Sequence, residues 1–154
     1  MRKWIVIGIV LVLLVAGVLV YRSYQPSQSR QVDEFTSDEQ GFSFSGEMGD
    51  LEVGYTDPAT ADFGVPIYPG AVAAHDEAVG EVNINGKSFL MGAYTASDTK
   101  ANVVSYYERE IEGAIVGSIE EGEQVQTIIK APNETGINIS TKDSKTSIVI
   151  VKPL

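Results

Sequence analysis

Side chains that could perform chemistry are few in this chain, and they do not follow a catalytic spacing. The 154 residues include one histidine, His75, which stands beside Asp76 and Glu77, and no cysteine. A zinc or copper site draws on several histidine or thiolate ligands, so His75 has no partners with which to form one. The sequence contains neither a glycine-rich phosphate loop nor a Gly-x-Ser-x-Gly motif. We therefore expect a protein that is not an enzyme, with no metal and no cofactor.

Four acidic residues suit calcium in type but not in spacing. Calcium takes about six to eight oxygen ligands, and carboxylates are available at Asp57, Asp62, Asp76 and Glu77. The Asp-x-Asp-x-Asp-Gly spacing of a calcium loop is absent. The simplest interpretation is a solvated acidic surface, and a cation site belongs only to the alternative function given below.

A second group of acids lies in and after a predicted helix, and it is the predicted partner-binding surface. The residues are Tyr106, Glu108, Glu112, Glu120, Glu121 and Glu123. Glu108 and Glu112 repel each other at i, i+4 spacing by about 0.2–0.5 kcal/mol, and a basic partner would relieve this cost. The same acids also fit the solvated outer face of a helix and the turn after it.

Aromatic residues offer an alternative site between the helix and a sheet. Tyr68 and Tyr107 are the predicted ligand-pocket residues, because curled α+β domains hold ligands in such a position. The helix phase puts Tyr107 on the buried stripe, whereas Tyr106 points about 100° away, towards the rim. Simple filling of the core is the preferred interpretation of these aromatics, because aromatic side chains commonly fill space in a core.

The charge distribution divides the chain in two and excludes one class of partner. The net charge is −10, from 11 basic and 21 acidic residues, so a phosphate backbone is repelled and nucleic-acid binding is not expected. The first 30 residues hold four basic residues and no acid, whereas the remainder holds seven basic and 21 acidic residues. Residues 22–40 are polar and acidic, with Pro26 early, and predict a flexible stalk.

An apolar run near the N-terminus predicts a membrane segment. Trp4 to Val20 contains only apolar residues and glycine, and Arg2 and Lys3 precede it. A transmembrane helix over 4–21 would leave a cytoplasmic tail, 1–3, and an extracytoplasmic remainder, because basic residues favour the inner side. A cleaved signal peptide has a similar pattern, with Val15-Ala16-Gly17 as the nearest cleavage sequence.

The rest of the chain predicts an α+β domain at 63–154, after an uncertain β-like segment at 41–62. That segment is either one or two short strands that form a hairpin packed on the domain, or a stalk with occasional apolar residues. Asn85-Gly86 indicates a hairpin turn, and Ser97 or Asp98 is the expected helix cap. The fold class is α+β, with one amphipathic helix packed on a curled antiparallel sheet in the order ββαββββ. The expected strands are 81–84, 87–95, 114–119, 123–130, 136–141 and 146–152, and the expected helix is 99–112. The helix stripe is Ala101, Val104, Tyr107 and Ile111, with Val103 beside it, and the sheet core candidates are Val125, Ile128, Ile137, Ile139, Ile148 and Ile150.

One pattern in this domain resembles other proteins. Val65-Pro66-Ile67-Tyr68-Pro69-Gly70-Ala71, then Thr95, Ser97-Asp98 and Tyr106-Tyr107, resembles small membrane-anchored or exported microbial domains with a VPxYPGA opening. The resemblance covers roughly residues 63–154 and implies an architecture but no activity.

Together these features predict a single-pass, membrane-anchored, extracytoplasmic domain that acts as a non-catalytic protein-interaction or accessory module of the cell envelope. Its expected partners are the membrane, through 4–21, and an envelope protein. The alternative is a small-ligand or cation-binding sensor domain. The tripeptides at Asn133 and Asn138 also match the N-glycosylation pattern.

Overall fold

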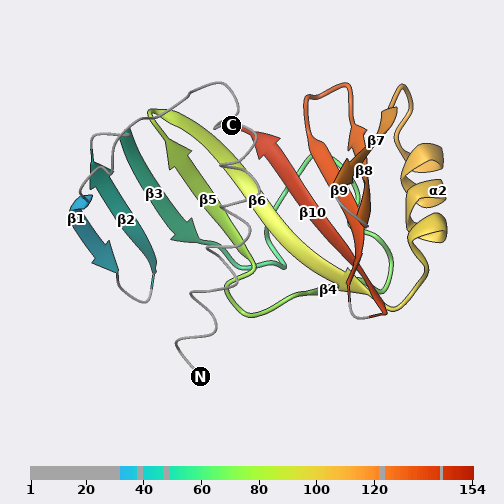
Figure 1. The fold of residues 1–154 in the computed structure, drawn as a ribbon, viewed down its shortest axis with the longest axis horizontal. Helices are drawn as coiled ribbons and strands as arrows, with labels where there is room; N and C mark the ends of the chain where they lie inside the picture. The colour runs from blue at the N-terminus through green and yellow to red at the C-terminus, as the bar shows by residue number, and fades with distance from the viewer. Residues whose placement is uncertain (1–31, 38–39, 47–48, 122–123, 143) are drawn as a thin grey trace. The chain divides into compact units, whose positions relative to one another are not determined.

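The computed structural model describes residues 32–37, 40–46, 49–121, 124–142 and 144–154 (Figure 1). The chain divides into two compact units, residues 1–30 and 31–154, and every described residue belongs to the second. The predicted tail at 1–3, the predicted helix at 4–21 and the first part of the predicted stalk lie outside the described residues.

Strands dominate this unit. The elements in chain order are β1 (Val32–Ser37), β2 (Gly41–Gly46), β3 (Gly49–Tyr55), β4 (Val72–Ala73), β5 (Val79–Ile84), β6 (Lys87–Ala96), α2 (Lys100–Glu110), β7 (Ile115–Glu121), β8 (Gln124–Lys130), β9 (Gly136–Lys142) and β10 (Lys145–Pro153). Nine strands form one sheet in the order β1-β2-β3-β5-β6-β10-β9-β8-β7, and the short β4 pairs with β6 (Figure 1). Every pair is antiparallel.

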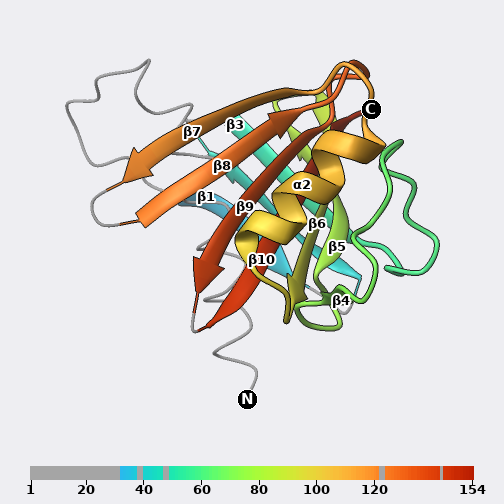
Figure 2. The same cartoon turned by 90° about the vertical axis from the view of Figure 1, so that its right-hand side faces the viewer.

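The position of α2 follows from the strand order. The chain leaves β6, passes through α2, begins again at the outermost strand β7, and returns strand by strand until β10 pairs with β6. A connection from β6 to β7 must pass over the strands between them, and Figure 2 shows α2 lying across that face of the sheet. Short polar turns join β7 to β10, as antiparallel neighbours require.

The β5–β6 hairpin turns where the sequence predicts it. Asn85 and Gly86 both have positive φ, at 52° and 78°, which is the backbone conformation that a type I′ turn requires. The Gly86 N–H donates to the Asn83 side chain at 3.0 Å, and the Asp50 N–H donates to the Asn85 side chain at 2.9 Å. The turn therefore also holds the start of β3.

The main core lies between α2 and the sheet. Val103, Tyr107 and Ile111 of the helix segment are buried against alternate residues of β6, β8, β9 and β10. The buried members of this core are Phe63, Val79, Leu90, Tyr94, Ala96, Val103, Tyr107, Ile111, Ile129, Ala131, Ile137, Ile139, Ile148 and Ile150. Phe63 packs edge-to-face on Tyr94, with ring centroids 6.2 Å apart.

Close packing also fixes a glycine in this core. A Cβ atom at Gly92 would lie 2.5 Å from Cζ of Phe63 and 2.8 Å from Cε2 of Tyr94. Both side chains are buried, so neither can move away without disturbing its neighbours. The Phe63 ring packs directly over position 92 of β6, so only glycine leaves room for it there.

The predicted fold class was wrong. The described unit is mainly one antiparallel β-sheet with a single short helix, and not an α+β domain in the order ββαββββ. Residues 32–55 contribute β1, β2 and β3 to the same sheet, because β3 pairs with β5 from Leu51↔Ile84 to Tyr55↔Gly80. The sequence pattern leaves open whether the segment at 41–62 packs on the domain or belongs to a stalk, since a pairing across some 30 residues leaves no local signal. β1 also replaces part of the predicted stalk at 22–40.

Four details of the helix and core also differ from prediction. The N-cap is Thr99, whose hydroxyl accepts from the Asn102 N–H at 3.3 Å, and not Ser97 or Asp98. Ala101 is exposed, whereas Val103 is buried. Val125 is 47% exposed, and Ile128 lies on the sheet face away from α2 because the buried Ile129 is its neighbour. Ile137, Ile139, Ile148 and Ile150 are buried as predicted.

No helix in the described part of the chain is long and apolar enough to cross a membrane. The predicted transmembrane helix over 4–21 is not among these residues, so the structure gives it no support. The extracytoplasmic location stays a prediction.

Candidate functional site

The predicted partner-binding residues fall on two separate surfaces. Tyr106 and Glu108 lie on α2, and Glu112 lies in the turn that follows it. Glu120 is near the far end of β7, about 16 Å from Ile115 at ~3.3 Å per residue. Glu121 ends β7 but its side chain is not described, and Glu123 lies outside the described residues. The structure therefore does not gather these residues into one site.

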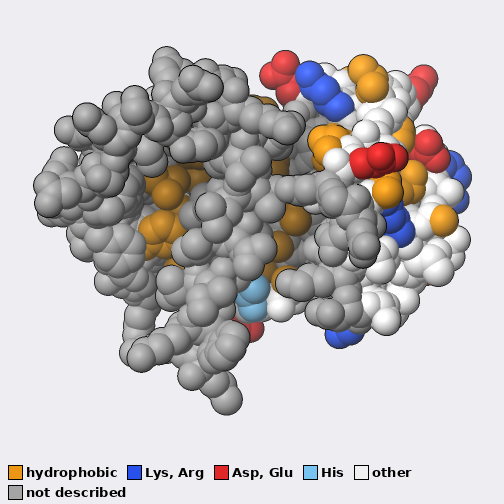
Figure 3. All heavy atoms as spheres, viewed as in Figure 1, with side chains coloured by type: hydrophobic (Ala, Val, Ile, Leu, Met, Phe, Trp, Pro, Cys, Tyr) orange, Lys and Arg blue, Asp and Glu red, His pale blue; other side chains and the backbone are white. Residues whose placement is uncertain are grey.

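β7 is an edge strand that exposes apolar side chains. It pairs with β8 alone, in continuous register from Ile115↔Lys130 to Glu121↔Gln124. Among the described residues, six large hydrophobic side chains are markedly exposed, and four of them lie on β7 and β8: Ile115 at 70%, Val116 at 39%, Ile119 at 45% and Val125 at 47%. Figure 3 shows hydrophobic side chains reaching the surface among both acidic and basic ones on this side of the molecule, at the right.

The exposed residues of β7 point to both faces of the sheet. Val116 is opposite Ile129, which is buried under α2, so Val116 lies on the helix-covered face. Ile115 and Ile119 are opposite Lys130 and Gln126, and they lie on the other face. Exposed acids stand at both ends of this apolar stretch, Glu112 before it and Glu120 after it. We call Ile115–Glu120 together with Glu112 the β7 edge.

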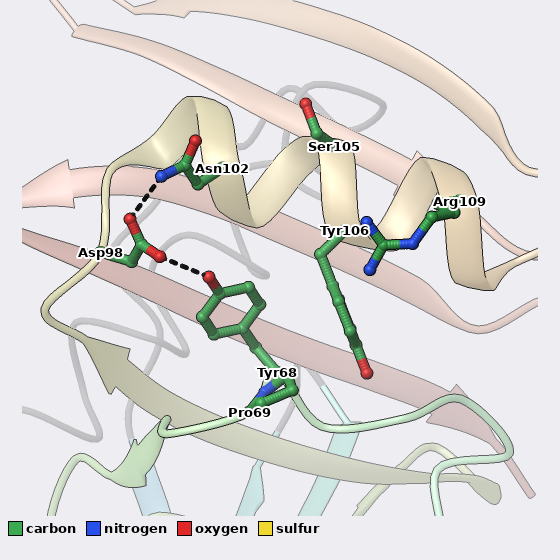
Figure 4. Close-up of a pocket in the computed structure, with 7 residues that line it drawn as sticks. All are labelled: Tyr68, Pro69, Asp98, Asn102, Ser105, Tyr106 and Arg109. Carbon is green, nitrogen blue, oxygen red and sulfur yellow. Dashed lines mark hydrogen bonds between the residues drawn. The ribbon is translucent and has the colours of Figure 1, made fainter.

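A second surface is a pocket beside α2, which we call the tyrosine pocket. It has a volume of ≈ 320 Å³ and is lined by Tyr68, Pro69, Asp98, Asn102, Ser105, Tyr106 and Arg109. The rings of Tyr68 and Tyr106 meet edge-to-face with centroids 5.1 Å apart, and Figure 4 shows both beneath the helix. Tyr107 was predicted to line a pocket with Tyr68, but its side chain is fully buried. Tyr106 takes that place.

Asp98 organises one wall of the tyrosine pocket. Its carboxylate accepts hydrogen bonds from the Tyr68 hydroxyl at 2.7 Å, the Asn102 amide at 2.6 Å and the Thr99 N–H at 2.8 Å (Figure 4). The hydrogen bonds from Tyr68 and Asn102 lower the pKa of Asp98. The hydrogen bond between Tyr68 and Asp98 also raises the pKa of the Tyr68 hydroxyl. The wall is thus an ionised carboxylate whose oxygens already have donors.

Arg109 closes the other end of the tyrosine pocket. Its guanidinium carbon lies 5.7 Å from the centroid of the Tyr106 ring, within cation–π range. Nε donates to Glu110 at 2.9 Å, in an exposed ion pair. Within the described residues it makes no other hydrogen bond, so both terminal amino groups remain as donors.

Two of the four acids considered for calcium have structural roles. Asp57 accepts from the Ala59 N–H at 2.9 Å and Asp62 accepts from the Gly64 N–H at 2.8 Å, so each stabilises its own turn. No three His, Asp or Glu side chains come together as a metal-binding cluster in the part of the chain that the structure describes. Asn133 is exposed, whereas Asn138 is partly buried in β9, where its amide donates to Gln126.

Sequence reasoning missed four polar residues of the tyrosine pocket, although a signal for them exists. Asp98, Asn102, Ser105 and Arg109 are spaced by four, three and four residues, which is one face of a helix. The β7 edge has no comparable signal. The sequence predicts a strand over 114–119, but which strand lies at an edge depends on the whole sheet order.

The chain was compared with protein-family models, with curated proteins and with solved structures, and none matches it. The resemblance to exported domains with a VPxYPGA opening therefore stays an expectation. The function has to be argued from the two surfaces.

Proposed function

We propose that the protein is a non-catalytic interaction module whose β7 edge binds an extended segment of another protein. The bound segment would add a strand beside β7, with main-chain hydrogen bonds for affinity and alternate side chains for specificity. The observation that carries this proposal is that β7 pairs on one side only among the described residues, with Ile115, Val116 and Ile119 exposed.

The two edges of the sheet differ in how they are protected. Natural edge strands are blunted by bulges, by lysine or proline, or by being very short. The β1 edge has a register shift between Val32 and Glu34, which is such a bulge. β7 has seven residues in unbroken register, with no proline and no lysine. An edge left regular and apolar suits strand addition.

Charge selects the kind of segment. Exposed Glu112 and Glu120 flank the apolar stretch, so a segment with apolar residues at its centre and a basic residue at each end would complement the β7 edge. Lys130 faces Ile115 and is the one basic neighbour in the strand register. A second copy of this chain fits poorly, because two molecules with a net charge of −10 repel each other.

The alternative function, a small-ligand sensor, was predicted to use Tyr68 and Tyr107, and only Tyr68 lines the pocket. Tyr107 is buried, and its hydroxyl already accepts a hydrogen bond from the Tyr68 N–H. A cation-binding sensor is also less well supported, because the carboxylates of Asp57 and Asp62 each accept a hydrogen bond within their own turn. The interaction module is therefore the better supported function.

The proposal is tested with a defined peptide on the full chain. The probe is a labelled seven-residue peptide of alternating valine and threonine with a lysine at each end, and binding is followed by fluorescence anisotropy. We expect saturable binding that weakens as salt rises, because exposed charges are screened. A peptide with glutamate at both ends should bind more weakly.

Two matched variants locate the binding surface. Ile119→Lys puts a charge on the β7 edge. The isoleucine is 45% exposed, so its further burial by a partner is worth about 0.7–1.4 kcal/mol, and we expect a loss of roughly 3- to 10-fold in affinity. Val72→Lys makes the same change at a 62% exposed residue of β4 and should leave affinity unchanged. Equal losses in both variants, no binding of either peptide, or tighter binding of the glutamate peptide would refute the proposal.

A further inference from the structure

The tyrosine pocket is separate from the β7 edge, and its chemistry identifies a class of ligand. It lies on the side of α2 that carries Asn102, Tyr106 and Arg109, whereas the β7 edge begins after the helix has ended. The two surfaces can therefore be altered independently.

The hydrogen-bonding capacity of the tyrosine pocket consists mainly of donors. The Asp98 carboxylate already accepts three hydrogen bonds. The Asn102 amide oxygen and the Ser105 hydroxyl point away from the two rings in Figure 4. What faces a ligand is the pair of terminal amino groups of Arg109, the Tyr106 hydroxyl, and the rings of Tyr68 and Tyr106. A ligand that fits must be rich in acceptors, poor in donors, and partly apolar.

The simplest acceptor-rich ligand is an anion, and the negative charges around the tyrosine pocket argue against one. Glu110 is paired with Arg109, and Asp98 is ionised on the opposite wall. With a net charge of −10 on the chain, an anion gains no net attraction at this pocket. A sugar ring meets a different difficulty, because its hydroxyl groups need acceptors that are already occupied or turned away.

We propose that the tyrosine pocket binds a proline-rich segment of a partner protein in the polyproline II conformation. A proline has a carbonyl acceptor but no N–H donor, so it matches a site that supplies donors. Its flat ring packs on aromatic side chains, and extended proline-rich segments dock in aromatic-lined grooves at low entropic cost. Arg109 and Tyr106 donate to the carbonyl groups of the segment. The rings of Tyr68 and Tyr106, with Pro69 beside them, receive a proline ring.

The test uses a defined peptide and the purified full chain. The probe is a capped nine-residue peptide of three Pro-Ala-Pro repeats, and its control has glycine in place of every proline. Titration is followed by NMR shifts of the amides of α2 and Tyr68. We expect saturable shifts with the proline peptide and none with the glycine peptide. Cellobiose and benzoate are titrated in the same way, and neither should shift these amides.

Conservative variants separate the proposed contacts from general effects on folding. Arg109→Met keeps the apolar stem and removes the donors, and Tyr106→Phe keeps the ring and removes the hydroxyl. Each should weaken the proline peptide by roughly 2- to 12-fold, the range that the net contribution of one hydrogen bond corresponds to. Lys87→Met and Tyr55→Phe, which lie elsewhere on β6 and β3, should have no effect.

The proposal is overturned by any of three results. These are the absence of binding to the wild-type chain, equal binding of the glycine peptide, and unchanged affinity in both pocket variants. Shifts caused by cellobiose or benzoate instead of the proline peptide would assign the pocket to a different ligand. Loss of binding in Ile119→Lys would place the peptide on the β7 edge.

Discussion

The backbone N–H of Tyr68 donates a hydrogen bond to the phenol oxygen of Tyr107 at 3.2 Å, across 39 residues of sequence. Burial raises the pKa of the Tyr107 hydroxyl above its ordinary value of 10.0, so this oxygen is neutral at physiological pH. The bond fixes the loop before β4 on α2, and it thereby sets the Tyr68 ring beside Tyr106. The tyrosine pocket depends on this connection.

Removing that phenol oxygen should therefore cost stability. Tyr107→Phe leaves the partly buried Tyr68 N–H without an acceptor, and we expect a loss of about 1–3 kcal/mol in the free energy of unfolding. Tyr94→Phe is the matched control, because the buried Tyr94 hydroxyl has no hydrogen-bond partner among the described residues. That variant should be neutral or slightly stabilising. The free energy of unfolding of both variants is measured by urea denaturation. Equal losses of stability would contradict the hydrogen bond assigned to the Tyr107 hydroxyl.

The N-cap of α2 can be identified by mutation. Thr99→Ala removes the hydroxyl that accepts from the Asn102 N–H, and we expect a loss of about 0.5–2 kcal/mol. Ser97→Ala changes an exposed residue that precedes the cap and should have almost no effect. A larger loss in thermal stability for Ser97→Ala than for Thr99→Ala would mean that the helix begins earlier.

Asp98 should make stability depend on pH in one direction. Its folded-state pKa is lowered from 3.8, so its ionised form stabilises the fold above that value, and this contribution disappears as pH falls through the lower folded pKa. Asp98→Ala should be less stable than the wild type at neutral pH. The gap in melting temperature should narrow below about pH 4. A gap that stays constant down to about pH 2 would show that the hydrogen bonds of Asp98 do not favour its ionised form.

Gly92 should tolerate no side chain, because Phe63 and Tyr94 occupy the space. Gly92→Ala should lower the free energy of unfolding by about 1–3 kcal/mol, as overpacking does in other cores. Gly117→Ala is the control, because a Cβ on that β7 glycine meets no atom within 4 Å. Its effect should be neutral or stabilising by up to ~1 kcal/mol. Chemical denaturation that ranked the two variants in the opposite order would contradict the packing around Gly92.

Local features of the fold were predictable from sequence, and long-range ones were not. The Asn85-Gly86 turn and the buried isoleucines of β9 and β10 follow from turn chemistry and alternation. The membership of β1 to β3 in the sheet does not, because β1 lies in a polar, acidic stretch that predicts a stalk, and the alternation around Phe42 and Leu51 indicates strands without showing where they pair. Only the pairing of β3 with β5 reveals it.

The sites show the same division. The helix phase separates buried Tyr107 from half-buried Tyr106, as the sequence predicts. Tyr68 could not be placed beside Tyr106 from sequence, because a loop carries it there. Val125 looks like a core residue in a strand pattern but is 47% exposed, because it lies at the start of β8 opposite Glu120, four residues before the buried Ile129 on the same face.

Amide hydrogen exchange of β7, with and without the lysine-ended peptide, tests the central proposal most directly. Backbone N–H groups on the outer side of an edge strand are exposed to water, and an added strand would give them hydrogen-bond partners. We predict that alternate amides between Ile115 and Glu120 become protected when the peptide binds, while the amides of β9 and β10 stay as they were. Bound peptide with no added protection on β7 would contradict strand addition.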